Sequence, residues 1–406
     1  MAFVSRLFES NRHIAVTSES WNEQYVRSYL QTLLEGIKKA RKSDGHWPDE
    51  LGAFSGSIYA GVAGIAWTLD QLHLRGYLAE HQSGLCTTAV GETETSSGDA
   101  ALFGEYQVPV SHSFYLGSSG IELQEWKETG DAARLDSLHS QIINNQQHPW
   151  MENLWGAPST MLVASHLLSA TGEERFSQQI RFGAAYMEER LEDHPDVDCQ
   201  MWNIDLYGER TWLLGAGHGF VGNVFPIIRS PQAFDKDTMS RWRERIINTA
   251  MRTAERDNGM ANWGQSIGNA REGRDSMLVQ QCHGAPGFII ALSSLMKSGN
   301  PEFDLLMLEA GELVWQAGPL DKYPGLCHGT PGNGYALLKL YKTTNDSTWL
   351  SRARTFAMSA IKQHSSLSAI DPVSKRYSLW DGDAGLAMYL ADCIDASTDF
   401  PTLDYF

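Results

Sequence analysis

The sequence predicts an all-α fold, a double-layered α/α barrel (toroid) of seven inner and seven outer helices. A Gly-x-x-Gly pattern recurs seven times along the 406 residues, and apolar runs of helical length follow its copies. Amphipathic segments with charged faces separate these runs. Helix pairs repeated around a closed ring would cover every inner helix with an outer one.

The repeat sets the positions of the expected helices. Successive copies begin 39 to 65 residues apart, which leaves room for two helices and their loops. Small residues three apart let neighbouring backbones converge and let the chain turn with positive φ. The third copy is degenerate. The seven copies are Gly61 to Gly64, Gly117 to Gly120, Gly156 to Ser159, Gly219 to Gly222, Gly284 to Gly287, Gly329 to Gly332, and Gly382 to Gly385.

The runs that follow the glycines are apolar nearly all round, as helices buried on most sides must be. They predict inner helices within 64–74, 159–170, 287–296, 333–341 and 385–394. Segments with one charged face predict outer helices within 22–42, 174–194, 237–257 and 346–364. We expect one domain over residues 1–406, with the polar, aperiodic residues 82–112 as a loop or lid insertion.

Composition excludes several classes of protein. Hydrophobic residues make up 42% and charged residues 20% of the chain, and no run of about eighteen apolar residues could cross a membrane. The net charge of −17 argues against nucleic-acid binding. The N-terminus lacks the apolar core of a secretory signal, so we expect a cytoplasmic protein. Five cysteines are too few for a disulfide framework.

Three histidines occupy the position just before the first glycine of a copy. That position holds Ala60, Leu116, Trp155, His218, His283, His328 and Asp381 in chain order. Cys282 and Cys327 stand one residue earlier, in QQCHGAPG and GLCHGTPGNG. Two thiolates and an imidazole suit Zn²⁺. We expect one Cys-His pair to give both ligands and the other only its Cys; the alternative is a buried cysteine pair without metal.

A Cys-Cys-His zinc with an open fourth position is a catalytic arrangement, because a substrate thiol arriving there is deprotonated. Two protein thiolates cancel the charge of the ion, so the substrate thiolate stays nucleophilic. His218 has no adjacent cysteine and suits a general acid or base, although a structural histidine is the alternative. Cys86, Cys199 and Cys393 lie outside the repeat register and are interpreted as ordinary cysteines.

The glycine-rich helix starts, with GAGHGFVG and the two Cys-His-Gly motifs, closely resemble the lanthionine synthetase C-like family over essentially the full chain. The resemblance implies a double seven-helix barrel with one zinc. Its zinc ligands correspond to Cys282, Cys327 and His328, with His283 beside the metal but not a ligand. The proton-handling histidine corresponds to His218, and Glu152 stands where bacterial cyclases have a functional aspartate.

The SIGN segment, YSLWDGDAGLAMYLADCI and the terminal FPTLDYF resemble the eukaryotic branch, which binds glutathione and adds it to dehydroalanine and dehydrobutyrine. In that branch, basic residues matching Lys322 and Arg376 hold anionic groups; solvated surface charges are the alternative. Two positions depart from the family pattern. Gln281 replaces a common Trp that we expect near the substrate, and Ser159 replaces a glycine.

The resemblance implies a zinc-dependent enzyme that adds glutathione to dehydroamino acids in peptides or proteins, in some cases after phosphate elimination from phosphoserine or phosphothreonine. The first alternative is a lanthipeptide cyclase that forms intramolecular thioethers. The second is a non-catalytic signalling protein that binds zinc and glutathione. An α/α-barrel glycosidase is disfavoured because only Asp381 and Glu152 offer carboxylates at the barrel mouth.

Overall fold

The computed structural model describes residues 6–43, 45–48, 56–79, 111–206, 208–267, 277–370 and 375–406. The expected loop or lid at 82–112 falls outside these residues except for its last two positions, and Cys86 falls outside them as well. Within the described part, no helix is long and apolar enough to cross a membrane.

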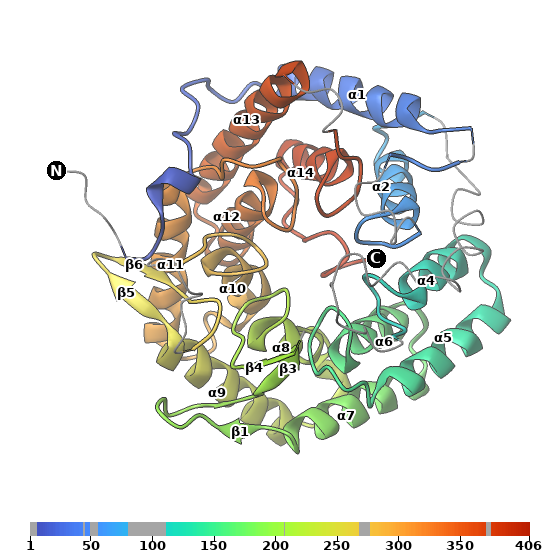
Figure 1. The fold of residues 1–406 in the computed structure, drawn as a ribbon, viewed down its shortest axis with the longest axis vertical. Helices are drawn as coiled ribbons and strands as arrows, with labels where there is room; N and C mark the ends of the chain where they lie inside the picture. Colours follow the sequence, from blue (N-terminus) through green and yellow to red (C-terminus); the bar gives the residue numbers. More distant parts are fainter. Residues whose placement is uncertain are drawn as a thin grey trace.

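In the described residues, seven inner helices form a closed ring around a central axis (Figure 1). Each contacts the next along the chain, and the last contacts the first, so the ring has no open edge. This confirms the predicted inner layer. The helices are α2 (Val62–Leu74), α4 (Ser118–Thr129), α6 (Ala157–Thr171), α8 (Phe220–Arg229), α10 (Ala285–Leu292), α12 (Thr330–Thr344) and α14 (Asp383–Asp395).

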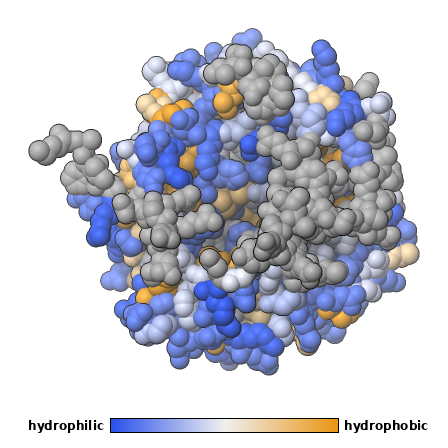
Figure 2. All heavy atoms as spheres, in the orientation of Figure 1, coloured by the Kyte–Doolittle hydropathy of each residue, from blue (hydrophilic) through white to orange (hydrophobic). Residues whose placement is uncertain are grey.

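Outer helices surround this ring, and six of the seven predicted lie in the described residues. Their charged faces give the molecule a largely hydrophilic rim (Figure 2). They pack on the inner helices as an amphipathic layer must; α13, for example, contacts both α12 and α14. The outer helices are α1 (Glu23–Ala40), α5 (Ala132–Asn145), α7 (Glu174–Glu188), α9 (Lys236–Thr253), α11 (Pro301–Ala317) and α13 (Ser347–Ile370).

Three short antiparallel hairpins in the described part of the chain depart from the purely helical expectation. They pair β1 (Glu192–Asp193) with β2 (Gln200–Met201), β3 (Ile204–Leu206) with β4 (Glu209–Thr211), and β5 (Glu255–Asp257) with β6 (Met260–Asn262). Two outer helices therefore end before the predicted 194 and 257. Asn258 and Gly259 both have positive φ, the geometry that a two-residue hairpin turn requires.

The glycine motif works mainly by close approach. Its first glycine is the N-cap of every inner helix. A Cβ on the second glycine would lie 1.9 to 2.3 Å from a carbonyl oxygen six residues earlier, which no side chain tolerates. The expected positive φ was wrong for most copies: among the first glycines only Gly284 has it, at 108°.

Ser159 explains the degenerate third copy. Its hydroxyl accepts a hydrogen bond from the Phe114 amide at 2.9 Å and so ties the third repeat to the second. The C-terminal segment packs inside the barrel near the axis (Figure 1). There the Phe406 ring stacks on Trp67 with centroids 5.5 Å apart.

Candidate metal centre

Cys282, Cys327 and His328 come together at the starts of α10 and α12. Their ligand atoms all lie within 4.8 Å of one another, and they form the group of potential metal ligands found among the described residues. The two cysteines are 9% and 8% exposed. His283 does not belong to this group, although it follows Cys282 directly.

A chain of backbone hydrogen bonds places the two cysteines. Six residues stand two positions before the first glycine of their repeats, and the amides of the first five donate to the carbonyl of the counterpart in the next repeat. These N···O distances are 2.9 to 3.2 Å, in the order Gly217, Cys282, Cys327, Trp380, Tyr59 and Tyr115. The third repeat joins through its Asn153 side chain, which donates to the Ala216 carbonyl. The sulfurs are therefore carried by consecutive members of one chain of backbone bonds.

The electrostatics of the metal-free residues suit a cation. The adjacent Cys282 thiol, together with burial, holds the pKa of Cys327 well above its usual value. Burial lowers the pKa of His328, but the Cys327 sulfur and Asp381 outweigh it and raise that pKa to about 9. Two buried sulfurs cannot both ionise without a neighbouring positive charge, which a divalent ion supplies. The donor set fits zinc.

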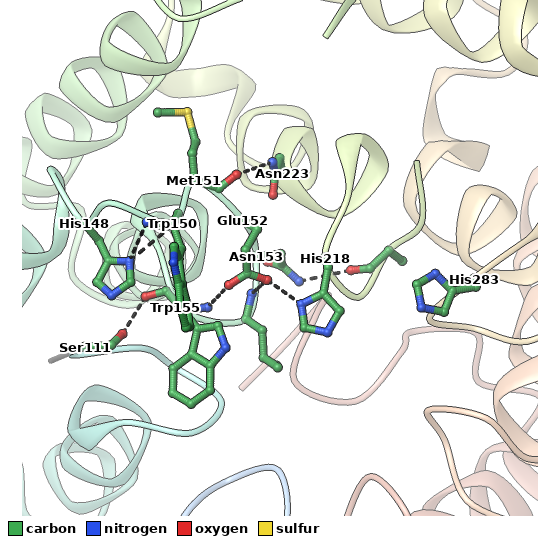
Figure 3. Close-up of polar contacts among 12 residues, drawn as sticks. Ser111, His148, Trp150, Met151, Glu152, Asn153, Trp155, His218, Asn223 and His283 are labelled. Carbon is green, nitrogen blue, oxygen red and sulfur yellow. Dashed lines mark hydrogen bonds and ion pairs between the residues drawn. The ribbon is translucent and has the colours of Figure 1, made fainter. Parts of the chain in front are cut away.

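His218 and Glu152 form a second polar pair beside the metal ligands. Figure 3 shows the His218 ring pointing at the Glu152 carboxylate, and Nδ1 lies 2.7 Å from Oε2. Glu152 is fully buried and also accepts the amides of Leu154 at 3.0 Å and Trp155 at 2.5 Å. An ionised carboxylate can only accept hydrogen bonds, so Nδ1 is the donor in this pair. The other ring nitrogen, Nε2, is then the proton acceptor of the neutral ring.

The pair belongs to the same end of the barrel as the cysteines. His218 follows Gly217, whose amide donates to the Cys282 carbonyl at 3.1 Å. A Cβ on Gly217 would lie 3.2 Å from the Cys282 Cβ. His283 also lies at this end (Figure 3), with its ring against Gly215 and Nε2 3.4 Å from the Gln265 amide nitrogen.

Lys322 lies near the metal ligands, and Arg376 lies against the residue that follows Lys322 in the chain. The Lys322 ammonium donates to the Gln280 side-chain oxygen at 3.3 Å and contributes to the electrostatic field at His328. The Arg376 guanidinium lies over the Tyr323 ring, 5.8 Å from its centroid. Tyr323 directly follows Lys322.

A cavity of about 30 Å³ lies on the barrel axis beneath the sulfurs, room for about one water molecule. Gln281 and Leu403 also line it. Gln281, which stands where the family commonly has Trp, therefore does face the interior. All seven residues two positions before a first glycine border this cavity: Tyr59, Tyr115, Leu154, Gly217, Cys282, Cys327 and Trp380.

Several residues at the site were not predicted from sequence. Tyr59 and Trp380 share the register of the two cysteines, so extending that register to every repeat would have found them. Their rings stack with centroids 5.5 Å apart. Asp381 was noted only as a carboxylate, yet its oxygen lies 3.5 Å from His328 Nε2. Gln280 carries no sequence signal; its amide nitrogen lies 3.1 Å from the Cys282 sulfur.

Comparison with known proteins agrees with this architecture. Residues 52–405 match the model of the lanthionine synthetase C-like protein family. Glutathione S-transferase LANCL1 of Danio rerio is 32% identical over 195 residues, 47% of this chain and 45% of that protein. LanC-like protein GCL1 of Arabidopsis thaliana is 33% identical over 188 residues, 44% of this chain and 40% of that protein. The alignments thus span less than half of either relative.

A solved structure shows the same fold. Nisin cyclase superposes with a TM-score of 0.62 at 14% identity, over 91% of this chain and 94% of that one. The resemblance of the repeat motifs, the closed double ring of helices and the family match over residues 52–405 agree. The chain belongs to the lanthionine synthetase C-like family.

Proposed function

We propose that this protein is a zinc-dependent enzyme that adds the thiol of glutathione to dehydroalanine or dehydrobutyrine residues in peptides or proteins. The observation that carries the proposal is the convergence of Cys282, Cys327 and His328 within 4.8 Å, next to a histidine held by a buried carboxylate. The name of the Danio rerio relative, a glutathione S-transferase, supports the choice of thiol.

In this proposal the three ligands hold the ion and leave one position to substrate. Bound there, zinc would lower the pKa of an incoming thiol and keep its sulfur nucleophilic at neutral pH. Cys282 and Cys327 contribute two negative charges, and His328 contributes a neutral donor. Asp381, 3.5 Å from His328 Nε2, limits the orientation of that ring.

His218 handles the proton in the same proposal. The substrate sulfur forms a bond to the β-carbon while the electrons of the double bond shift towards the carbonyl oxygen. The product of this step is an enolate. The proton that leaves the thiol passes to His218 Nε2 and then to the α-carbon, so the step balances. Glu152 keeps Nδ1 protonated and stabilises the imidazolium formed in between. His283 borders this region and is a proposed second contact for the reacting groups.

Lys322 and Arg376 are proposed to hold the anionic groups of the substrates. A glutathione carboxylate suits either cation. If the same site first eliminates phosphate from phosphoserine or phosphothreonine, these cations would hold the leaving phosphate. The proximity of Lys322 to the metal ligands through Gln280 supports this assignment.

The test uses the zinc-loaded full chain, glutathione and a synthetic peptide with one dehydroalanine. We expect the peptide to gain the mass of glutathione by mass spectrometry, faster than in buffer alone, and the Cys327→Ala variant to lose this rate. Stoichiometric zinc with no thiol addition would overturn the enzyme proposal.

A second peptide, which carries both a dehydroalanine and a cysteine, distinguishes the cyclase alternative. Cyclisation leaves its mass unchanged and removes its free thiol. Glutathione binding by calorimetry without turnover of either peptide would favour the non-catalytic alternative.

A further inference from the structure

Gln280 connects a cation to one of the metal-ligand sulfurs. Its side chain is buried, with 6% of the residue exposed. The Lys322 ammonium lies 3.3 Å from the Gln280 Oε1, and the Gln280 Nε2 lies 3.1 Å from the Cys282 sulfur. An ammonium can only donate, so the amide oxygen must face Lys322. The amide NH₂ therefore faces the sulfur and donates to it.

The local backbone holds this amide in place. The Gln280 and His283 amides each donate to the carbonyl of the other at 3.1 Å, which closes a tight bridge around Cys282. The Asn333 side chain donates to the Val279 carbonyl at 2.9 Å and fixes the preceding residue to α12. The donor thus reaches the sulfur from a braced loop.

The proposed reaction raises a question of selectivity among sulfurs. Three thiolates would surround one ion, and a conjugated electrophile would be brought close to all of them. Only the substrate sulfur must react. A hydrogen bond from a donor stabilises the lone pair of a thiolate and makes its attack on carbon slower.

We propose that Gln280 is a positioning residue that keeps Cys282 a metal ligand and prevents it from competing as a nucleophile. Lys322 takes part by fixing and polarising the amide, because its charge draws electron density towards the amide oxygen and leaves the NH₂ a stronger donor. The inference rests on the proposed function for its purpose. Its physical content, a slow-reacting Cys282 sulfur, is independent of turnover.

The experiment measures how fast iodoacetamide alkylates Cys282 in the zinc-loaded full chain, without glutathione or peptide. Mass spectrometry of the peptide that contains Cys282 reports the extent of alkylation. Gln280→Leu removes the donor, and Gln280→Glu keeps the shape but presents an oxygen to the sulfur. We expect alkylation to be about tenfold faster in Gln280→Leu than in wild type, and faster still in Gln280→Glu. Lys322→Met should give a smaller increase.

Gln146→Leu is the matched control, because Gln146 is 5% exposed and its amide bonds Gln179 instead of a sulfur. Its alkylation rate should equal that of wild type. In the cobalt-substituted proteins, loss of the donor should also move the sulfur-to-cobalt charge-transfer band to longer wavelength, which loosened packing alone would not do.

Wild-type alkylation rates in both Gln280 variants would overturn the inference, as would an equal increase in Gln146→Leu. Because no substrate is present, this result does not depend on whether the peptide assay succeeds. If the chain binds zinc but never transfers glutathione, the proposed function is wrong, but the alkylation rate of Cys282 still tests the inference.

Discussion

Replacing Glu152 by Gln tests the proton-handling pair most directly. Three donors face the two carboxylate oxygens: Trp155 N–H on Oε1, and Leu154 N–H and His218 Nδ1–H on Oε2. A glutamine must turn its NH₂ towards one of these sides, so at least one donor meets another donor. The least unfavourable placement keeps His218 bonded to the amide oxygen and sacrifices the Trp155 bond.

The magnitude follows from the charge that is lost. A hydrogen bond from His218 to a charged partner contributes about 1.5–3 kcal/mol, and a bond to the neutral amide would keep about half of that strength. The difference acts when the imidazolium forms, so it appears in the transition state. The loss is therefore about 0.75–1.5 kcal/mol, and we expect kcat to fall about 3- to 10-fold, because each 1.4 kcal/mol or so is a factor of ten.

The assay is steady-state glutathione addition with zinc content measured on the same samples. The KM for glutathione and the zinc content should stay near wild type, because the three metal ligands are untouched. Glu125→Gln is the control. Glu125 is also buried, at 2% exposure, but it lies in a different repeat from Glu152 and pairs with Arg134. Wild-type kcat in Glu152→Gln, alongside an inactive His218→Ala, would refute the reasoning.

Three further predictions concern the metal, the repeat and a buried acid. Cys327→Ala should lose zinc by elemental analysis after gel filtration, whereas Cys199→Ala, buried but outside the metal group, should keep it; zinc retained in both contradicts the ligand assignment. Gly332→Ala should destabilise the fold by about 3 kcal/mol in urea titration, because a Cβ would lie 1.9 Å from a carbonyl oxygen. Gly36→Ala, in open space on α1, should stabilise it by about 0.5–1 kcal/mol; equal effects would contradict the steric account. Burial raises the pKa of Asp392 to about 6 despite Arg75, so the folded state binds the proton more tightly than the unfolded chain. Asp392 should therefore raise the free energy of unfolding by about 1 kcal/mol as pH falls from 7 to 5. If the free energies of unfolding of wild type and Asp392→Asn differ by the same amount at both pH values, the prediction is wrong.

The repeat explains why so much of this fold could be predicted. Because the second glycine contacts a carbonyl six residues earlier, its identity reports a fixed loop geometry in each repeat. The residues before the first glycine are then placed at one end of the barrel. The repeat alone therefore predicts that Cys282, Cys327 and His328 lie close together, and their ligand atoms do lie within 4.8 Å of one another.

The features that the sequence did not predict depend on contacts that do not recur from one repeat to the next. The amide of Gln280 reaches Cys282 only because its loop folds back in a bridge to His283. No spacing encodes that contact. The β5–β6 hairpin departs from the prediction for a different reason. Asn258-Gly259 is typical of a hairpin turn, but the predicted charged helix runs to residue 257 and so includes the strand β5.

The closed ring of inner helices bears on how this protein can evolve. An open solenoid adds or loses repeats at its ends with little effect on its middle. The inner helices here close into a ring that has no ends, and two neighbouring repeats carry the metal-binding sulfurs. An added or a missing repeat would change the angle at which all neighbouring repeats meet, including the two that carry the sulfurs. The number seven is therefore tied to the chemistry, and variation between relatives should be confined to loops and outer helices.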